Sequence, residues 1–498
     1  MGSTARSDSE SFDVMIVGAG LSGINSAYRI QTELPGYSYT VLESRDAVGG
    51  TWDLFRYPGI RSDSDLHTFG FPWRPWTEHR AIAEGDAIRN YIRESAEEFG
   101  IDKKIRFGNK MLSADWSTEE QNWNILVDSN GEEKIYKARF IIFSTGYYDY
   151  NEPLKTTIPG IENFKGTRIH PQFWPEDLDY ANKKIIIIGS GATAVTLLPI
   201  LAQTAKHVTM LQRSPTYILS RPSVDPIGSF IRKIFPSWLA SRLVRYKFLV
   251  LPFLFSQFCS AFPEAARRTL HKRMQAELPS SMSIDPDFNP RYYPWQQRLC
   301  VCPDGDFYES IRNGSSDVVT DTIKRVTNIG IETTGGKVID ADIIITATGL
   351  KMLLAGGATL ARDGTPLSLP STFAWKSTML SDVPNAALVI GYANASWTLG
   401  ADAAAKLVTR LLKYMRKNNF SSAVPRVPDV DMRKQQLLDL NSTYVERAKG
   451  DLPSAGDRKP WLPRRNYFVD FWGAAYGDLT AGLEFSSAAD DAASKKVI

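Results

Sequence analysis

The sequence predicts an α/β protein made of two similar folding units, the second inserted into the first and carrying a helical insertion within it. A glycine-rich turn between an apolar strand and a helix occurs twice, near residue 20 and again near residue 190. Strand-like segments continue after the second unit. The chain is therefore expected to return to the first sheet after it has completed the second one.

Length and composition agree with such a fold and exclude several classes. The chain has 498 residues and 43% hydrophobic content, enough for two or three domains. A net charge of only +3 gives no reason to expect a nucleic-acid partner. The cysteines, Cys259, Cys300 and Cys302, are too few to staple a chain this long, which favours a reducing, cytoplasmic compartment. Because no further Cys/His pair lies near Cys300, no metal site is expected.

The segment boundaries follow from composition. Residues 1–11 and 481–498 are polar and are expected to be disordered tails, the first without the apolar core of a signal peptide. The first unit is expected at 12–152 and again at 336–480, and the second unit at 153–335. Within the second unit, about 222–290 is helical, aromatic and irregular, as in an insertion. The sequence carries no signature of an oligomeric state.

The most apolar stretch runs from Phe248 to Phe262 and contains Pro252. It is too short for a membrane-spanning helix, which needs about 18 or more apolar residues. We expect a buried pair of helices broken at the proline, the commoner outcome for a short apolar run. The alternative is a surface that touches a membrane or lines an apolar substrate entrance.

The first glycine turn is Gly18-Ala19-Gly20-Leu21-Ser22-Gly23. Its first glycine permits a tight turn, the second lets backbone approach a pyrophosphate, and the third lets helix and strand pack closely. The phosphates would lie at the helix N-terminus. Glu43 lies 20 residues after Gly23, at the end of the next predicted strand, where a carboxylate accepts hydrogen bonds from a ribose diol. These features predict an FAD site.

The second turn is Gly189-Ser190-Gly191-Ala192-Thr193-Ala194. The end of its next strand carries Arg213 and Ser214 instead of an acid. A guanidinium at this place pairs with the 2′-phosphate of NADPH, although an ordinary surface arginine is the alternative. The contrast between Glu43 and Arg213 assigns the cofactors. We therefore predict two Rossmann-like dinucleotide-binding domains, the first for FAD and the second for NADPH.

Two dinucleotide folds also occur in disulfide reductases, but those enzymes need a Cys-x-x-x-x-Cys or Cys-x-x-Cys pair beside the flavin, and this sequence has neither spacing. The run from Phe164 to Pro175 has the pattern FxGxxxHxxxWP, and the run from Gly50 to Asp63 has the pattern GxWxxxxYPGxxxD. On these motifs the chain, from about Phe12 to Asp470, resembles the class B flavoprotein monooxygenases. Within them it resembles the Baeyer–Villiger monooxygenases and their ethionamide-activating subgroup.

The resemblance implies a reaction. NADPH would reduce the flavin, and reduced flavin with O₂ would form a C4a-peroxide that attacks a small-molecule ketone and inserts one oxygen atom to give an ester or lactone. The alternative is oxygenation of sulfur or nitrogen in soft nucleophiles by the same flavin peroxide. A third hypothesis is an uncoupled NADPH oxidase that releases hydrogen peroxide.

The resemblance also implies residue roles. Arg298 matches the active-site arginine of the family and Asp63 the acid that orients it, although a surface ion pair and a turn residue are the plain alternatives. His170 is expected to couple the two domains rather than to transfer protons. Gln297 stands where the family often has a lysine near the NADPH phosphate, so Arg213 would carry more of the cofactor preference.

The expected FAD contacts are Gly18, Gly20, Leu21, Ser22, Gly23, Glu43, Gly50, Thr51, Trp52, Asp63, Phe69 and Met111. The expected NADP contacts are Arg61, Ser62, Gly189, Ser190, Gly191, Ala192, Thr193, Ala194, Arg213, Ser214, Gln297 and Arg298. The expected domain linker is formed by Phe164, Gly166, His170 and Trp174. By the same resemblance, Asn394–Trp397 is expected near the isoalloxazine, and a helix beginning near Leu399 would direct its N-terminus at the flavin.

Overall fold

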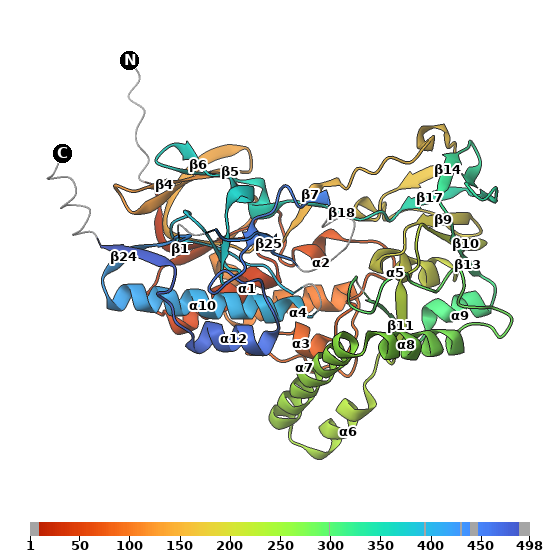
Figure 1. The fold of residues 1–498 in the computed structure, drawn as a ribbon. Helices are drawn as coiled ribbons and strands as arrows, with labels where there is room; N and C mark the ends of the chain where they lie inside the picture. The colour runs from red at the N-terminus through yellow and green to blue at the C-terminus, as the bar shows by residue number, and fades with distance from the viewer. Residues whose placement is uncertain (1–8, 298, 393–394, 429–430, 439–446, 488–498) are drawn as a thin grey trace.

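The computed structural model describes residues 9–297, 299–392, 395–428, 431–438 and 447–487, and it contains two α/β units side by side (Figure 1). Arg298 and Asn394, both expected near the active site, lie outside the described residues. The predicted fold class, two Rossmann-like units with one inserted in the other, is confirmed.

The larger sheet belongs to the first unit. Its central strands are parallel, with β1 between β2 and β6, while β4, β5 and the first half of β6 form an antiparallel meander. The strand order is β20 (Thr365–Pro366), β19 (Thr359–Arg362), β4 (Asn109–Ser117), β5 (Asn122–Ser129), β6 (Glu132–Phe143), β1 (Ser11–Val17), β2 (Tyr39–Leu42) and β3 (Ile105–Arg106), with β23 (Ala386–Leu388) also paired to β6.

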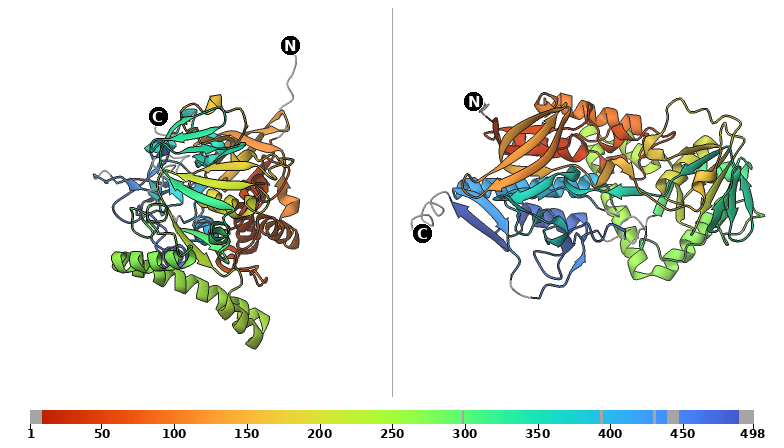
Figure 2. Two further views of the ribbon diagram at one scale, coloured as in Figure 1. Left: turned by 90° about the vertical axis from the view of Figure 1, so that its right-hand side faces the viewer. Right: turned by 90° about the horizontal axis from the view of Figure 1, so that it is seen from above.

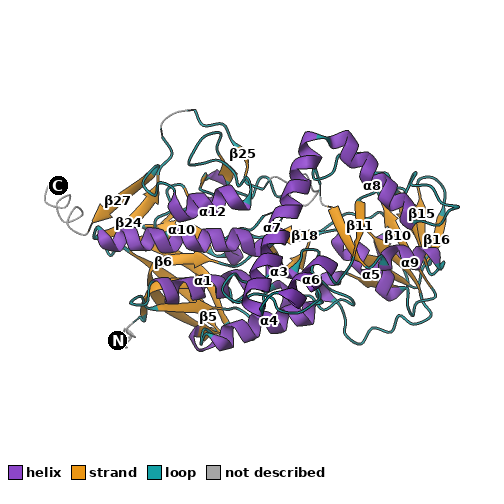
Figure 3. Ribbon diagram, turned by 90° about the horizontal axis from the view of Figure 1, so that it is seen from below, coloured by secondary structure: helices purple, strands orange, loops and turns teal. Residues whose placement is uncertain are grey.

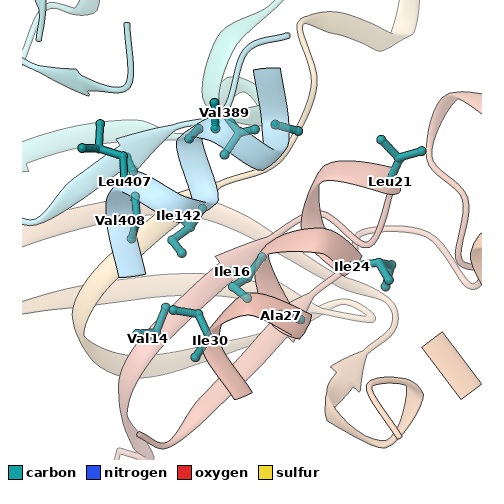
Figure 4. Packing of buried hydrophobic residues seen from close by; sticks show 14 of the residues in the cluster. Val14, Ile16, Leu21, Ile24, Ala27, Ile30, Ile142, Val389, Leu407 and Val408 are labelled. Atoms are coloured by element: carbon teal, nitrogen blue, oxygen red, sulfur yellow. The ribbon is translucent and has the colours of Figure 1, made fainter. Parts of the chain in front are cut away.

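Side chains alternate between the two faces of β1, and both faces are buried. Val14 and Ile16 pack in one cluster, whereas Met15 and Val17 pack in another. A parallel strand covered on both sides is expected to be apolar at every position, as this one is. Figure 4 shows Ile16 packed against the first helix, α1 (Leu21–Glu33), with Ile142 nearby.

The long helix α10 (Trp397–Lys417) packs beside α1 on this face. Among the described residues, the other α-helices of the first unit are α2 (Thr51–Leu54), α3 (Leu66–Phe69), α4 (Gly85–Glu98) and α12 (Tyr467–Tyr476). Its short outer strands are β21 (Ala374–Trp375), β22 (Met379–Leu380), β24 (Phe420–Pro425), β25 (Gln435–Gln436), β26 (Ser454–Ala455) and β27 (Leu483–Ser487).

The second unit contains a fully parallel sheet. Its order is β13 (Ser316–Thr320), β10 (His207–Gln212), β9 (Lys184–Ile188), β17 (Ile343–Thr346) and β8 (Thr167–Ile169). One face is covered by α5 (Ala192–Leu201) and α9 (Asp306–Arg312), the other by a small antiparallel sheet of β14 (Ile323–Val326), β15 (Gly330–Thr333) and β16 (Val338–Asp340). Isoleucines of β9 alternate between these two cores.

The predicted return to the first unit at 336 is wrong. Strand β16 completes the small sheet of the second unit, and β17 pairs with β9 and β8 of its main sheet. The chain returns only after Thr346, through β18 (Leu350–Met352), which runs antiparallel to the outgoing β7 (Tyr148–Pro153). The returning strands are apolar in both units, so composition alone could not place the crossing.

Both segments predicted to be disordered tails contain residues with defined structure. Glu10 accepts hydrogen bonds from the guanidinium of Arg106, at 2.9 and 2.5 Å, and β1 begins at Ser11. At the other end the prediction of a tail from 481 is wrong, because β27 pairs along its length with β24. Residues 1–8 and 488–498 lie outside the described residues.

The predicted helical insertion is present and consists of α6 (Pro226–Ile234), α7 (Ser237–Ala261) and α8 (Pro263–Glu277), flanked by the paired strands β11 (Tyr217–Arg221) and β12 (Leu299–Pro303). The expectation of a buried, broken pair at 248–262 is wrong. Helix α7 continues through Pro252, and its only buried residues are Ala240, Val244 and Cys259. Helices α6 and α7 project from the body of the protein (Figure 2).

None of the described helices is by itself long and apolar enough to cross a membrane. Helices α7 and α8 together pass that test of length and composition, although the chain bends by 117° between them.

Candidate cofactor and substrate sites

A first cavity of about 490 Å³ opens where the carboxyl ends of β1 and β2 meet the N-terminus of α1. The glycine turn forms one wall. Gly18 has φ +102°, and a side chain there would come within 2.7 Å of the Ser144 carbonyl oxygen. A Cβ on Gly23 would lie 1.8 Å from the Gly18 carbonyl oxygen. Only glycine allows this helix to approach the strand so closely, which keeps the helix N-terminus open to an anion.

Glu43 lies in the same cavity at the end of β2 and is 5% exposed. Its Oε2 accepts a hydrogen bond of 2.7 Å from the Ala19 N–H, and its Oε1 accepts one of 3.0 Å from the Arg45 N–H. Burial raises the pKa of the carboxyl group, and these two backbone donors oppose the shift. Oε1 also accepts a long hydrogen bond of 3.4 Å from the Ser44 hydroxyl. Oε2 keeps a further lone pair, so the fixed carboxylate can accept a hydrogen bond from a ribose diol.

The other end of the first cavity is aromatic. The rings of Trp52 and Phe69 meet edge to face, with their centroids 5.6 Å apart. The ring centroids of Trp397 and Tyr147 lie 5.1 Å apart. The Trp397 indole N–H donates a hydrogen bond of 2.8 Å to the Ser22 hydroxyl, which ties α10 to the glycine turn. Because α10 begins at Trp397, its N-terminus lies at the cavity and favours negative charge there. These residues fit the flat isoalloxazine ring of FAD.

Most of the predicted FAD contacts line this cavity, namely Gly18, Gly20, Leu21, Ser22, Glu43, Gly50, Thr51, Trp52, Phe69 and Met111. Gly23 packs beneath the turn, and Asp63 lines a different cavity. The prediction missed Ser144–Gly146, Tyr148 and Tyr150, which also line it. The topology gives the signal for Ser144–Gly146, since they follow the carboxyl end of β6, next to β1.

A second cavity, of about 480 Å³, lies at the glycine turn of the second unit. A Cβ on Gly189 would lie 2.3 Å from the Ala347 carbonyl oxygen, whereas one on Gly191 would meet nothing within 4 Å. The backbone at Gly191 is therefore open to a ligand. The predicted NADP contacts that line this cavity are Gly189, Ser190, Gly191, Ala192, Thr193, Arg213, Ser214 and Gln297.

Three predicted NADP contacts lie elsewhere in the structure. Arg61 forms an ion pair with Asp306 at 2.5 Å, and Ser62 bonds to the Ser64 carbonyl oxygen. Ala194 is fully buried in the core. Tyr148 lines both the first and the second cavity, so the two dinucleotide sites are neighbours.

A third cavity, of about 200 Å³, lies between α3, α7 and the start of α12. It contains Asp63, which is exposed, together with Asp65 and Arg221. Thr68 and Ser396 line it, and the residues that follow them, Phe69 and Trp397, line the first cavity. The third cavity is therefore directly behind the aromatic end of the first.

Burial and neighbouring charges shift the pKa values of the charged groups in the third cavity. Asp65 caps α3 by accepting hydrogen bonds of 2.7 Å from both the N–H and the hydroxyl of Thr68. Burial among surrounding protein atoms raises its pKa to about 6. Burial lowers the pKa of Arg221, while the nearby Asp65 opposes that shift. Arg221 lines the third cavity, and no described residue accepts a hydrogen bond from its guanidinium.

Arg298 itself is outside the described residues, but its neighbours Gln297 and Leu299 line the second and third cavities. Sequence reasoning missed Arg221. Its only local signal is a charged residue at the end of a strand, directly before Pro222.

The run from Phe164 to Pro175, expected to be the domain linker, forms the edge strand β8 and the turn after it. Phe164 and Trp174 are buried, and a Cβ on Gly166 would lie 2.3 Å from the Asp342 carbonyl oxygen. The His170 Nδ1 accepts a hydrogen bond of 3.3 Å from the Gln172 N–H, and burial lowers the His170 pKa. His170 does not line the three cavities.

Comparison with known proteins agrees with the assignment of one cavity to FAD and another to NADP. The family described as flavin-binding monooxygenase-like matches residues 12–246. The FAD-containing monooxygenase EthA of Mycolicibacterium smegmatis is 49% identical over 462 residues, 93% of this chain and 94% of that protein. The probable FAD-binding monooxygenase AlmA of Acinetobacter baylyi is 42% identical over 461 residues, 92% of each chain.

Solved structures share the fold. An oxidised steroid monooxygenase bound to NADP superposes with a TM-score of 0.74 at 20% identity, over 96% of this chain and 100% of that one. An open structure of cyclohexanone monooxygenase superposes with a TM-score of 0.72 at 20% identity, also over 96% of this chain and 100% of that one. Since the relatives match almost the whole length and the two glycine-turn cavities fit their cofactors, the chain belongs to the flavin-binding monooxygenase family and binds FAD and NADP.

Proposed function

We propose that this flavoenzyme is an NADPH-dependent Baeyer–Villiger monooxygenase, which inserts one oxygen atom of O₂ beside the carbonyl of a ketone to give an ester or lactone. The observation that carries the proposal is the position of the third cavity. It shares a wall with the aromatic end of the FAD cavity and contains Asp63, Asp65 and Arg221.

The first cavity would hold FAD, which when bound supplies the redox chemistry of O₂ activation. Glu43 would hold the ribose, and the N-terminus of α1 would face the pyrophosphate. Trp52 and Trp397 would fix the ring system, and the N-terminus of α10 would stabilise negative charge on its polar edge.

The third cavity would hold the ketone. When the carbonyl carbon is attacked, negative charge develops on the carbonyl oxygen, and a fixed guanidinium in a site of low dielectric stabilises it. Arg298 with Asp63 is proposed for this role, as the family resemblance implies. Arg221 is a second guanidinium of the same cavity and can act on the same charge. Arginine suits the task because it stays ionised when it is buried.

The second cavity would hold NADPH beside the flavin. Arg213 lines it at the end of β10, where it can pair with the 2′-phosphate, and Gln297 lies in the same cavity. Tyr148, common to both dinucleotide cavities, would stand at the junction through which the nicotinamide reaches the flavin.

The test is aerobic turnover of linear, cyclic, aryl and steroid-like ketones, and of sulfides, with NADPH and with NADH. We expect ketone products heavier by one oxygen atom. Arg298→Ala should still show NADPH-driven bleaching of the flavin spectrum but form no ester. Sulfoxide formation with every ketone left unchanged would instead establish oxygenation of soft nucleophiles, and one hydrogen peroxide per NADPH throughout would establish an oxidase.

A further inference from the structure

The underside of the molecule is unusually apolar. Most of the exposed large hydrophobic side chains of the described residues lie in two segments, 224–262 and 468–476. They include Phe230 (63% exposed), Trp238 (62%), Leu254 (54%), Trp472 (68%) and Tyr476 (69%). Contiguous exposed apolar surface of this kind marks a binding surface rather than ordinary solvent-facing protein.

The two segments form one surface, here called the underside patch and made of α6, α7 and α12. Phe253 of α7 and Phe468 of α12 meet edge to face, with ring centroids 5.3 Å apart. Figure 3, drawn from below, shows these three helices on the same side of the molecule. The patch therefore joins the helical insertion of the second unit to the C-terminal part of the first.

Helix α6 is amphipathic. Ile227, Phe230 and Ile234 follow one another at helical spacing and are all exposed. The opposite side holds the buried Gly228 and Arg232, whose guanidinium bonds to the Thr77 carbonyl oxygen. The apolar side of α6 thus faces outward while its other side is fastened to the protein.

The charge around the patch selects its partner. Between Pro226 and Pro263, the stretch that forms α6 and α7, the sequence has no acidic residue, and its basic residues are Arg232, Lys233, Arg242, Arg245 and Lys247. Helix α12 adds one acid, Asp470, which accepts a hydrogen bond of 2.7 Å from the Tyr392 hydroxyl. Lys233 and Arg242 are exposed, and the Arg242 guanidinium lies 5.7 Å from the Trp238 ring centroid. Apolar and tryptophan side chains beside basic ones bind the interface of an anionic bilayer. A symmetric dimer through this patch would set the same cations against each other.

We propose that the underside patch docks on an anionic lipid bilayer, and that the third cavity takes apolar substrates from that bilayer. The helices of the patch also line the cavity: Pro252, Phe253 and Phe468 face it, while Leu254 and Trp472 of the same helices are exposed. A molecule leaving the bilayer would need to pass only between α7 and α12. The docking stands by itself, whereas the substrate route rests on the function proposed above.

The test compares the FAD-loaded enzyme with the double variant F230E/W472E, neither residue of which lines a cavity. The matched control is I329E/V338E, which changes two side chains of similar exposure, 58% and 60%, in or beside the small sheet of the second unit. Each protein is floated with vesicles of phosphatidylcholine, with and without phosphatidylglycerol. Turnover is then measured with a short sulfide in water and with a long-chain ketone placed in the vesicles.

We expect the unchanged enzyme and the control variant to float with anionic vesicles, with little flotation on pure phosphatidylcholine. F230E/W472E should lose at least about tenfold in bound fraction, because it places two carboxylates at the acyl boundary. Its turnover of the water-soluble sulfide should stay unchanged while turnover of the vesicle-borne ketone falls.

Several outcomes would overturn the docking proposal. They are absence of flotation by the unchanged enzyme, equal flotation of both double variants, or a dimer that F230E/W472E dissociates without any change in vesicle binding. If no ketone is oxygenated by any protein but flotation follows the expected pattern, the proposed Baeyer–Villiger function fails and the docking stands.

Discussion

The hydroxyl groups of Thr68 and Ser396 lie 2.6 Å apart and join the capped turn of α3 to the start of α10. Both residues line the third cavity, and the next residue of each, Phe69 and Trp397, lines the FAD cavity. One hydrogen bond between two segments 328 residues apart thus holds the wall between the FAD cavity and the third cavity. Any ligand of the third cavity is placed against the aromatic end of the flavin site.

The two glycine turns should respond differently to a methyl group. G23A places a Cβ 1.8 Å from the Gly18 carbonyl oxygen, so the helix must move. We expect its free energy of unfolding to fall by about 1–3 kcal/mol, as in other overpacked sites, with loss of bound FAD. Denaturant unfolding and the absorbance ratio of flavin to protein measure both effects.

G191A is the matched variant in the second turn. A Cβ there meets nothing within 4 Å, and φ is −81°, so folding should change by no more than about 0.5 kcal/mol. The methyl group would still occupy the approach of the NADP phosphates, and the KM for NADPH should rise. Equal stability losses in the two variants would show that the packing argument is wrong.

The preference for NADPH should depend on Arg213. Replacing it with alanine removes the guanidinium that lines the NADP cavity, where charged hydrogen bonds contribute about 1.5–3 kcal/mol. We expect the KM for NADPH to rise by about 10- to 100-fold while the KM for NADH stays nearly constant. Steady-state kinetics with both nucleotides test this. An equal rise in the KM for NADH would show that a residue other than Arg213 binds the 2′-phosphate.

Asp65 should make stability depend on pH. Its pKa is raised from 3.8 to about 6 by burial, so the folded state binds its proton more tightly than the unfolded state. Its contribution to stability is therefore fully present below about pH 4 and is lost as pH rises through about 6. D65N keeps an acceptor for the α3 cap and cannot ionise.

The variant D65N should accordingly match the unchanged enzyme near pH 4 and exceed it at pH 8. At pH 8 the free energy of unfolding of D65N should exceed that of the unchanged enzyme by less than about 3 kcal/mol, because water in the cavity screens the carboxylate. Urea unfolding at both pH values measures it. A variant less stable than the unchanged enzyme at pH 8 would mean that the ionised carboxylate is held favourably by Arg221.

Arg221 should affect oxygen transfer and not flavin reduction. R221M removes a guanidinium from the third cavity, and loss of one donor to a developing oxyanion costs about 10²–10³-fold in kcat. We expect NADPH-driven bleaching of the flavin to continue at its normal rate while product formation falls. R221K retains the charge and should recover part of the activity. If R221M lowers the thermal midpoint and product yield together and R221K restores neither, the residue is structural.

The motifs that sequence alone located are those whose chemistry is carried by neighbouring residues. Most residues of the first turn and Gly189–Thr193 of the second line their cavities as predicted, because a turn, a strand end and a helix start are local features. Glu43 and Arg213 follow one strand later in each unit, so their places were also predictable. Composition predicted the insertion at about 222–290, but not that α7 would remain one helix exposed over most of its length.

Tertiary structure decided what depends on packing between distant segments. Arg61 was expected at NADP but pairs with Asp306, and Ala194 faces the core. Arg221 enters the third cavity because β11 ends beside α3 and α7, a meeting that periodicity in one strand does not encode. The sequence by itself determined the two dinucleotide folds and their cofactors, because backbone turns and strand-end charges are local. Only the folded chain decided which residues surround the third cavity, since its walls come from elements hundreds of residues apart.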